Sequence, residues 1–184
     1  MYDIFISYRR DGGEALACLL CTKLRQIGCA VFYDVESLRS GKFNTKILSV
    51  IQKCTDVIVV LSEHALDRCG DENDWVRKEI AYSIKHNKNI IPVMMRNFQW
   101  PKTLPSEMSE LKNYNGISAN MEYFDATFEK LLSMLRSVSD KSIVNKIFSL
   151  FYYSFSPYTD QRLIKSKLII KGTYEVQLYV NIKK

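Results

Sequence analysis

The chain has 184 residues, which is enough for one domain or for one domain with an appendage. Apolar residues make up 47% of it, so it can build a sizeable core and is not a disordered chain. The net charge of +6 is concentrated in residues 138–184, which hold eight basic and three acidic residues; the nearly neutral remainder gives little basis for nucleic-acid binding.

The sequence also indicates a cellular location. No apolar run reaches the roughly 20 residues that a membrane helix needs. The first residues carry no basic segment ahead of an apolar run, which a secretion signal would have. We therefore expect a cytoplasmic protein that makes no membrane contact.

Five cysteines all lie before residue 70. Cys18 and Cys21 form a CxxC, but it lies within a helical apolar pattern, and no second ligand pair completes a metal set. We expect packed free thiols and no metal site.

Apolar runs and helical patterns alternate along the first 137 residues. Strands are predicted at 3–8, 29–34, 56–62, 89–95 and 114–119, and helices at 14–28, 44–54, 74–87 and 122–136. Pro92 predicts an edge position or an irregular end for the fourth strand. This order predicts an α/β fold, an open parallel sheet with helices on both faces. Ligands of such sheets bind outside the carboxyl ends of the strands, here at 9–13, 35–43, 63–73 and 96–105.

After residue 137 the pattern changes. A helix is predicted at 140–155, and strand-like alternation at 167–182 surrounds a plausible hairpin turn at 171–173. The segment 138–184 holds eight of the twenty Phe and Tyr residues. That density favours a packed appendage or a partner surface, and contact with a membrane or nucleic acid remains an alternative.

One short motif stands out, DWVRKEI at residues 74–80. Trp75 and Glu79 are four residues apart, so they share one face of the predicted helix. A structural interpretation is open, because a glutamate early in a helix is favoured by the helix dipole and has Arg77 and Lys85 nearby. The alternative is a functional carboxylate beside an aromatic wall.

Four stretches in order resemble a Toll/interleukin-1 receptor (TIR) domain over residues 1–137. They are YDIFISYRRDGG, VFYDVESLRSGKF, DVIVVLS, and DWVRKEI followed by KNIIPVMM. The resemblance implies a flavodoxin-like three-layer fold with a five-stranded parallel sheet, followed here by a C-terminal helix and hairpin at 138–184. Some members of the family only assemble with one another. Others cleave NAD+, using a glutamate in the helix after the third strand and a tryptophan four residues earlier, which are the positions of Glu79 and Trp75.

The chemistry of that reaction suits one carboxylate. Nicotinamide leaves as a neutral base from a cationic linkage, so no general acid has to protonate it. The remaining need is to stabilise an oxocarbenium-like ribose, which a single carboxylate can do. We therefore expect an NAD+ glycohydrolase or ADP-ribosyl cyclase with Glu79 as its catalytic residue, NAD+ as its substrate and no cofactor.

The resemblance also implies a set of residues that bind NAD+: Tyr8, Arg9, Arg10, Phe32, Asp34, Ser62 and Trp75. Arginines at the end of the first strand suit a pyrophosphate. Structural alternatives stay open: a solvated arginine pair, a core position for Phe32 and a turn cap for Ser62. Gly12 and Gly13 match no nucleotide fingerprint, which disfavours dehydrogenase and P-loop functions.

The loop 35–43 indicates a branch of the family. Its Leu38–Gly41 segment lacks the proline usual in vertebrate signalling relatives and resembles plant and bacterial members. A nearly bare domain of this kind resembles bacterial antiviral proteins of the Thoeris type, whose cyclic ADP-ribose product acts on a separate effector. The resemblance further implies self-association through TIR surfaces. The alternatives are a non-catalytic module that acts by homotypic assembly and a nucleoside deoxyribosyltransferase-like enzyme.

Overall fold

A computed structural model describes residues 2–33, 43–138, 167–170 and 174–177. The chain divides into two compact units, Met1–Ile147 and Phe148–Lys184. The helix predicted at 140–155 lies outside the described residues. Across the part of the chain that is described, no helix has the length and apolar character needed to cross a membrane.

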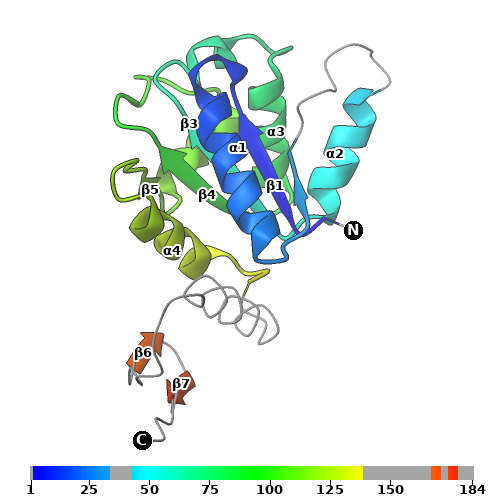
Figure 1. The fold of residues 1–184 in the computed structure, drawn as a ribbon. Coiled ribbons are helices and arrows are strands. Elements are labelled where there is room, and N and C mark those ends of the chain that lie inside the picture. The colour runs from blue at the N-terminus through cyan, green and yellow to red at the C-terminus, as the bar shows by residue number, and fades with distance from the viewer. Residues whose placement is uncertain (1, 34–42, 139–166, 171–173, 178–184) are drawn as a thin grey trace, which may run out of the picture. The chain divides into compact units, whose positions relative to one another are not determined.

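The first unit contains a five-stranded parallel sheet (Figure 1). Its strands are β1 (Ile4–Tyr8), β2 (Val31–Phe32), β3 (Asp56–Leu61), β4 (Asn89–Met94) and β5 (Ile117–Ser118). They lie side by side in the order β2-β1-β3-β4-β5, and each adjacent pair is parallel. This is the flavodoxin-like order, in which the topological switch point falls between β1 and β3. The predicted fold class is confirmed.

Helices cover both faces of the sheet. Alternating side chains explain the two layers, because Ile4 and Ile6 of β1 belong to one buried cluster and Phe5 to the other. The first cluster is covered by α1 (Arg10–Gln26) and α4 (Phe124–Met134), and the second by α2 (Phe43–Lys53), α3 (Trp75–Lys85) and the 3₁₀ segments η1 (Asp67–Gly70) and η2 (Ser106–Asn113). β3 is buried along its whole length, as its unbroken apolar run predicts.

The edge position or irregular end that Pro92 predicts for the fourth strand is wrong. β4 is an internal strand that pairs with β3 along all six of its residues, and Pro92 stands opposite Val59. The proline is tolerated because β5 pairs with β4 only from Val93 onward, so its missing N–H costs no ladder bond there. Gly116 precedes β5, and a Cβ on it would lie 3.1 Å from the Pro92 carbonyl oxygen.

The five cysteines are free thiols. Four of them are buried as predicted, whereas Cys18 is exposed. Burial raises the pKa of Cys29 and of Cys54 to about 11, so both thiols stay protonated near neutral pH.

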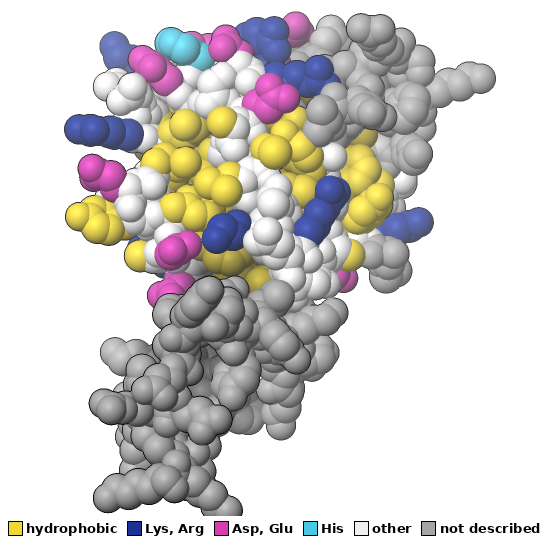
Figure 2. Space-filling view, in the orientation of Figure 1, with side chains coloured by type: hydrophobic (Ala, Val, Ile, Leu, Met, Phe, Trp, Pro, Cys, Tyr) yellow, Lys and Arg dark blue, Asp and Glu magenta, His cyan; other side chains and the backbone are white. Residues whose placement is uncertain are grey.

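Charged side chains of both signs gather along the upper edge of the molecule in Figure 2, where α1 begins and the strands of the sheet end. Among the exposed residues of this edge are Arg10, Asp11, Glu63, Asp67 and Arg68. Larger apolar patches occupy the face below it. The polar edge is the one where sheets of this topology bind ligands.

The second unit contains β6 (Lys167–Ile170) and β7 (Tyr174–Gln177). They pair antiparallel, with Ile170 opposite Tyr174. Residues 171–173, where the sequence predicts the hairpin turn, lie outside the described residues.

Candidate active site

Helix α3 begins at Trp75 because Asp74 caps it. The Asp74 carboxylate accepts a hydrogen bond from the backbone N–H of Arg77 at 3.0 Å, and the Asp74 backbone is extended. An aspartate at this position satisfies one of the unpaired N–H groups of the first turn. The cap therefore fixes where Trp75 and Glu79 lie along the helix.

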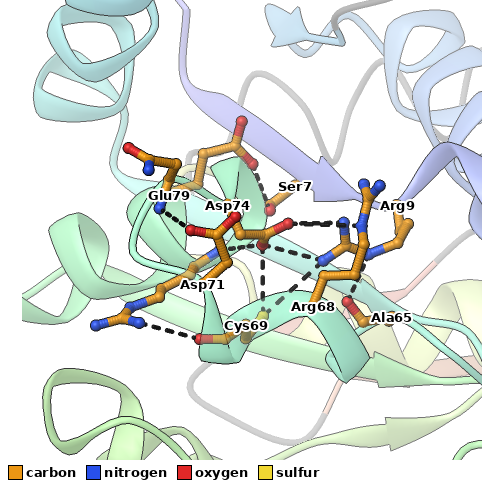
Figure 3. Close-up of polar contacts among 10 residues, drawn as sticks. Ser7, Arg9, Ala65, Arg68, Cys69, Asp71, Asp74 and Glu79 are labelled. Carbon is orange, nitrogen blue, oxygen red and sulfur yellow. Dashed lines mark hydrogen bonds and ion pairs between the residues drawn. The ribbon is translucent and has the colours of Figure 1, made fainter.

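Glu79 reaches back from α3 to the central sheet (Figure 3). The Ser7 hydroxyl donates a hydrogen bond to Glu79 Oε2 at 2.6 Å. Ser7 is the penultimate residue of β1 and is 1% exposed, whereas Glu79 is partly exposed. The carboxylate thus stands near the carboxyl end of β1, one of the two strands at the switch point.

Trp75 lies one helical turn before Glu79 and is also partly exposed. The four-residue spacing puts both side chains on one face of α3. The ammonium group of Lys78 lies 5.0 Å from the centre of the indole ring, a cation–π contact. The contact shows that the face of this indole ring can pack against a positive charge, such as that of a pyridinium ring.

Arg9 lies in a buried ion pair between β1 and α3. Its side chain is buried, and it donates to the two carboxylate oxygens of Asp74 at 2.9 and 3.0 Å and to the carbonyl oxygen of Ala65 at 2.9 Å (Figure 3). The guanidinium joins the end of β1 to the start of α3. This geometry favours a positioning role, and pyrophosphate binding by Arg9 stays a prediction.

The ion pair perturbs the groups around it. Burial alone would raise the pKa of the Asp74 carboxyl, but hydrogen bonds from Arg9 and from the Arg77 backbone lower it overall. The Cys69 thiol is packed against the pair and is 3.6 Å from Asp74 Oδ1. Burial, reinforced by the Asp74 charge, raises the pKa of Cys69 to about 12. Cys69 is thus a neutral donor and not a reactive thiolate.

Tyr8 and Arg10 flank Arg9. The Tyr8 ring stacks on the Tyr33 ring with their centres 5.1 Å apart, and burial is the largest cause of its raised pKa. Arg10 is exposed at the start of α1. Of the two adjacent arginines, Arg10 is the one whose side chain reaches the surface at the ligand edge of the sheet.

Phe32 lies at the end of β2 among other aromatic rings. It stacks on Phe5 at 5.5 Å and meets Tyr2 edge-on at 5.2 Å. Phe5 and Ser7 are two residues apart on β1, so Phe32 faces the same layer as Ser7 and Glu79. Asp34, the next candidate in the sequence, lies outside the described residues.

Ser62 supports the β1–α1 turn, which Asp11 and Gly12 form as the two non-helical residues near the start of α1. Its hydroxyl is 3.3 Å from the carbonyl oxygen of Asp11, to which it donates, and Ser62 is 3% exposed. Gly12 adopts a φ of +75°, and a Cβ on it would lie 3.3 Å from the Ser62 Cβ. Ser62 therefore packs beneath the β1–α1 turn, and its contact with ribose or phosphate stays a prediction.

Sequence reasoning missed Ser7. Its position two residues after Phe5 and two before Arg9 puts these three side chains on one face of the extended chain, but that pattern does not report the contact with Glu79. Within the described ranges, no three His, Cys, Asp or Glu side chains gather as a possible metal site.

Comparison with known proteins decides the family. A family model described as "TIR domain" matches residues 4–132. The chain belongs to the TIR domain family. Its fold agrees, since the solved TIR domain of the Toll-related receptor TRR-2 from Hydra magnipapillata has a TM-score of 0.52 at 21% identity and covers 74% of this chain and 99% of that one.

Curated relatives of this TIR domain carry names that refer to NAD+ or a product of it. It is 46% identical over 138 residues to "NAD(+) hydrolase SARM1" of Danio rerio, covering 72% of this chain and 19% of the relative, and 41% identical over 139 residues to "NAD(+) hydrolase sarm1" of Drosophila melanogaster, covering 73% and 10%. It is 32% identical over 97 residues to "Probable 2' cyclic ADP-D-ribose synthase TcpB" of Brucella abortus, covering 50% and 37%. The chain thus spans a fifth or less of the length of the first two relatives.

Proposed function

We propose that this TIR domain cleaves NAD+ between nicotinamide and ribose, with Glu79 as the catalytic carboxylate. The observation that carries the proposal is the placement of Glu79 beside Ser7, near the carboxyl end of β1 at the switch point of the sheet. Trp75 shares its helix face, and relatives up to 46% identical are named NAD(+) hydrolases.

The reaction needs one negative charge at the ribose. As the C1′–N bond breaks, its electron pair leaves with nicotinamide, which becomes neutral, and positive charge develops on the ribose. The Glu79 carboxylate stabilises that charge, and Trp75 supplies an apolar wall that excludes water and strengthens the interaction. Asp74, the other carboxylate at the start of α3, is 8% exposed and held by Arg9, so it is committed to the fold.

The ribose cation then takes a nucleophile. Attack by water forms ADP-ribose and releases one proton. Attack by a nucleophilic atom of the same ADP-ribosyl group forms a cyclic ADP-ribose, which lacks the water that hydrolysis adds, again with loss of one proton. The amount of water that reaches C1′ decides between these two outcomes. We propose cyclic ADP-ribose formation as the second outcome to look for.

The experiment is incubation of the purified chain with NAD+ at low and at high protein concentration, followed by chromatography and mass measurement of the products. Nicotinamide together with ADP-ribose, or with a cyclic product lighter than ADP-ribose by one water, supports the proposal. Intact NAD+ at both concentrations contradicts it and favours the non-catalytic assembly module.

Self-association and signalling extend the proposal. Met121 and Tyr123 are 55% and 68% exposed just before α4, and apolar side chains of this kind suit contact with a second copy. Light scattering over a range of concentrations tests this, with a monomer at every concentration as the contrary result.

The cytoplasmic antiviral role of the Thoeris type, with a product that acts on a separate effector, rests on the Leu38–Gly41 loop pattern. Protection of bacteria from phage that depends on Glu79 would support it.

A further inference from the structure

Strand β1 contacts helix α3 through two polar links. The lower link is the hydrogen bond from Ser7 to Glu79 at 2.6 Å. The upper link is the bidentate ion pair between Arg9 and Asp74 at 2.9 and 3.0 Å (Figure 3). Ser7 lies in β1 and Arg9 follows its last residue, whereas Glu79 lies in α3 and Asp74 caps its first turn.

The spacing of the two links matches. Ser7 and Arg9 are two residues apart on an extended chain, a rise of about 6.6 Å. Asp74 and Glu79 are five residues apart on or next to the helix, a rise of about 7.5 Å. Two links at nearly equal separation fix both the height and the rotation of α3 against β1.

We propose that Ser7 and the Arg9–Asp74 ion pair form a clamp between β1 and α3 that positions the Glu79 carboxylate for NAD+ cleavage. The inference rests on the proposed function and adds positioning residues to it. Ser7 holds one carboxylate oxygen from a rigid, buried strand, so the carboxylate is oriented before substrate arrives. Arg9 and Asp74 act at a distance by setting where the first turn of α3 begins.

Ser83 provides a matched comparison for Ser7. Its hydroxyl donates to the backbone carbonyl oxygen of Glu79 at 2.7 Å, and Ser83 is 0% exposed. Ser7 and Ser83 are therefore both buried serines that donate to the same residue. Only Ser7 reaches the carboxylate. If both serines had a purely structural role, replacing either one with alanine should lower kcat by a similar factor. The clamp predicts that only the replacement of Ser7 lowers kcat.

The first test compares kcat and KM for NAD+ cleavage in Ser7→Ala, Ser7→Thr and Ser83→Ala. Loss of a hydrogen bond to a charged group predicts a kcat lower by about 10- to 100-fold in Ser7→Ala, with KM changed little. Ser7→Thr keeps the hydroxyl and should recover most of the turnover. The kcat of Ser83→Ala should stay within about threefold of the kcat of the parent chain. Equal kcat values in Ser7→Ala and Ser83→Ala would overturn the clamp.

The second test addresses the upper link with Asp74→Asn, which keeps a good helix cap but removes the charge that Arg9 binds. Glu107→Gln is the control, since it weakens the ion pair of Arg77 with η2 and leaves the β1 link intact. Faster amide hydrogen exchange over residues 76–79 and lower kcat are expected in Asp74→Asn alone. Identical exchange in the two variants would overturn the clamp without bearing on NAD+ cleavage. A parent chain and a Glu79→Gln variant that are both inactive would instead overturn the proposed function.

Discussion

Arg9 and Asp74 are 65 positions apart in sequence and form a bidentate ion pair whose side chains are 7% and 5% exposed. Asp74 also caps α3, so one carboxylate serves the strand on one side and the helix on the other. An arginine that the resemblance assigns to the substrate thus also joins the end of β1 to the start of α3, and its binding of NAD+ stays a prediction.

Replacing Arg9 with Met should destabilise the fold strongly. It leaves the Asp74 carboxylate buried without its charge partner, which predicts a free energy of unfolding lower by about 3–5 kcal/mol. Urea unfolding monitored by circular dichroism measures it. Glu107→Gln, which weakens an exposed ion pair, should change the midpoint little; equal losses in the two variants would contradict the account.

The pH dependence of stability should report Asp74. Its pKa is lowered on folding, so its contribution to stability is fully present above the ordinary value of 3.8 and is lost as the pH falls through the folded-state pKa. The difference in free energy of unfolding between the parent chain and Asp74→Asn should therefore be constant near neutral pH and shrink below 3.8. A difference that stays unchanged into strong acid would show that the charge is irrelevant.

Gly12 and Gly70 should respond oppositely to alanine. At Gly12 the positive φ of 75° and the nearby Ser62 side chain both oppose a Cβ, which predicts a loss of about 1–3 kcal/mol. At Gly70 a Cβ would meet nothing within 4 Å, so Gly70→Ala should be neutral or slightly stabilising. Thermal unfolding of the two variants distinguishes them, and equal midpoints would mean that the β1–α1 turn relaxes freely.

The aromatic ring of Trp75 should contribute to the efficiency of NAD+ cleavage. Loss of the aromatic wall predicts a kcat/KM for NAD+ lower by about tenfold in Trp75→Ala. Trp75→Phe keeps a smaller ring and should retain most of the activity. Lys78→Met removes the cation that lies 5.0 Å from the ring centre and should not lower kcat/KM. Steady-state kinetics on the three variants measure this. A kcat/KM for Trp75→Ala equal to that of the parent chain would refute the role of the indole as an aromatic wall.

The alternation of apolar patterns was enough to predict the sheet and the helices that cover it. Periodicity reports which face of an element is buried, and that is a local property. The internal place of β4 was missed because Pro92 normally marks an edge, and only the late start of β5 makes it harmless. The 3₁₀ segment η2 was also missed, since its short helical turns carry no sustained period.

The site was predictable only in part. Glu79 and Trp75 came from a spacing on one helix together with a family resemblance. Their partner Ser7 is 72 positions away from Glu79, and no local pattern reports such a contact. The buried state of Arg9 depends on the same long-range pairing, here with Asp74. Contacts between side chains that are far apart in the sequence could not be predicted from local sequence patterns.

The most direct measurement is the rate of nicotinamide release from NAD+ by the parent chain, Glu79→Gln and Glu107→Gln, each shown to be folded. Glutamine keeps the shape of Glu79 but removes the charge that the ribose cation needs. We expect a rate lower by roughly 100- to 1,000-fold in Glu79→Gln and an almost unchanged rate in Glu107→Gln. A Glu79→Gln variant that releases nicotinamide as fast as the parent chain would contradict it.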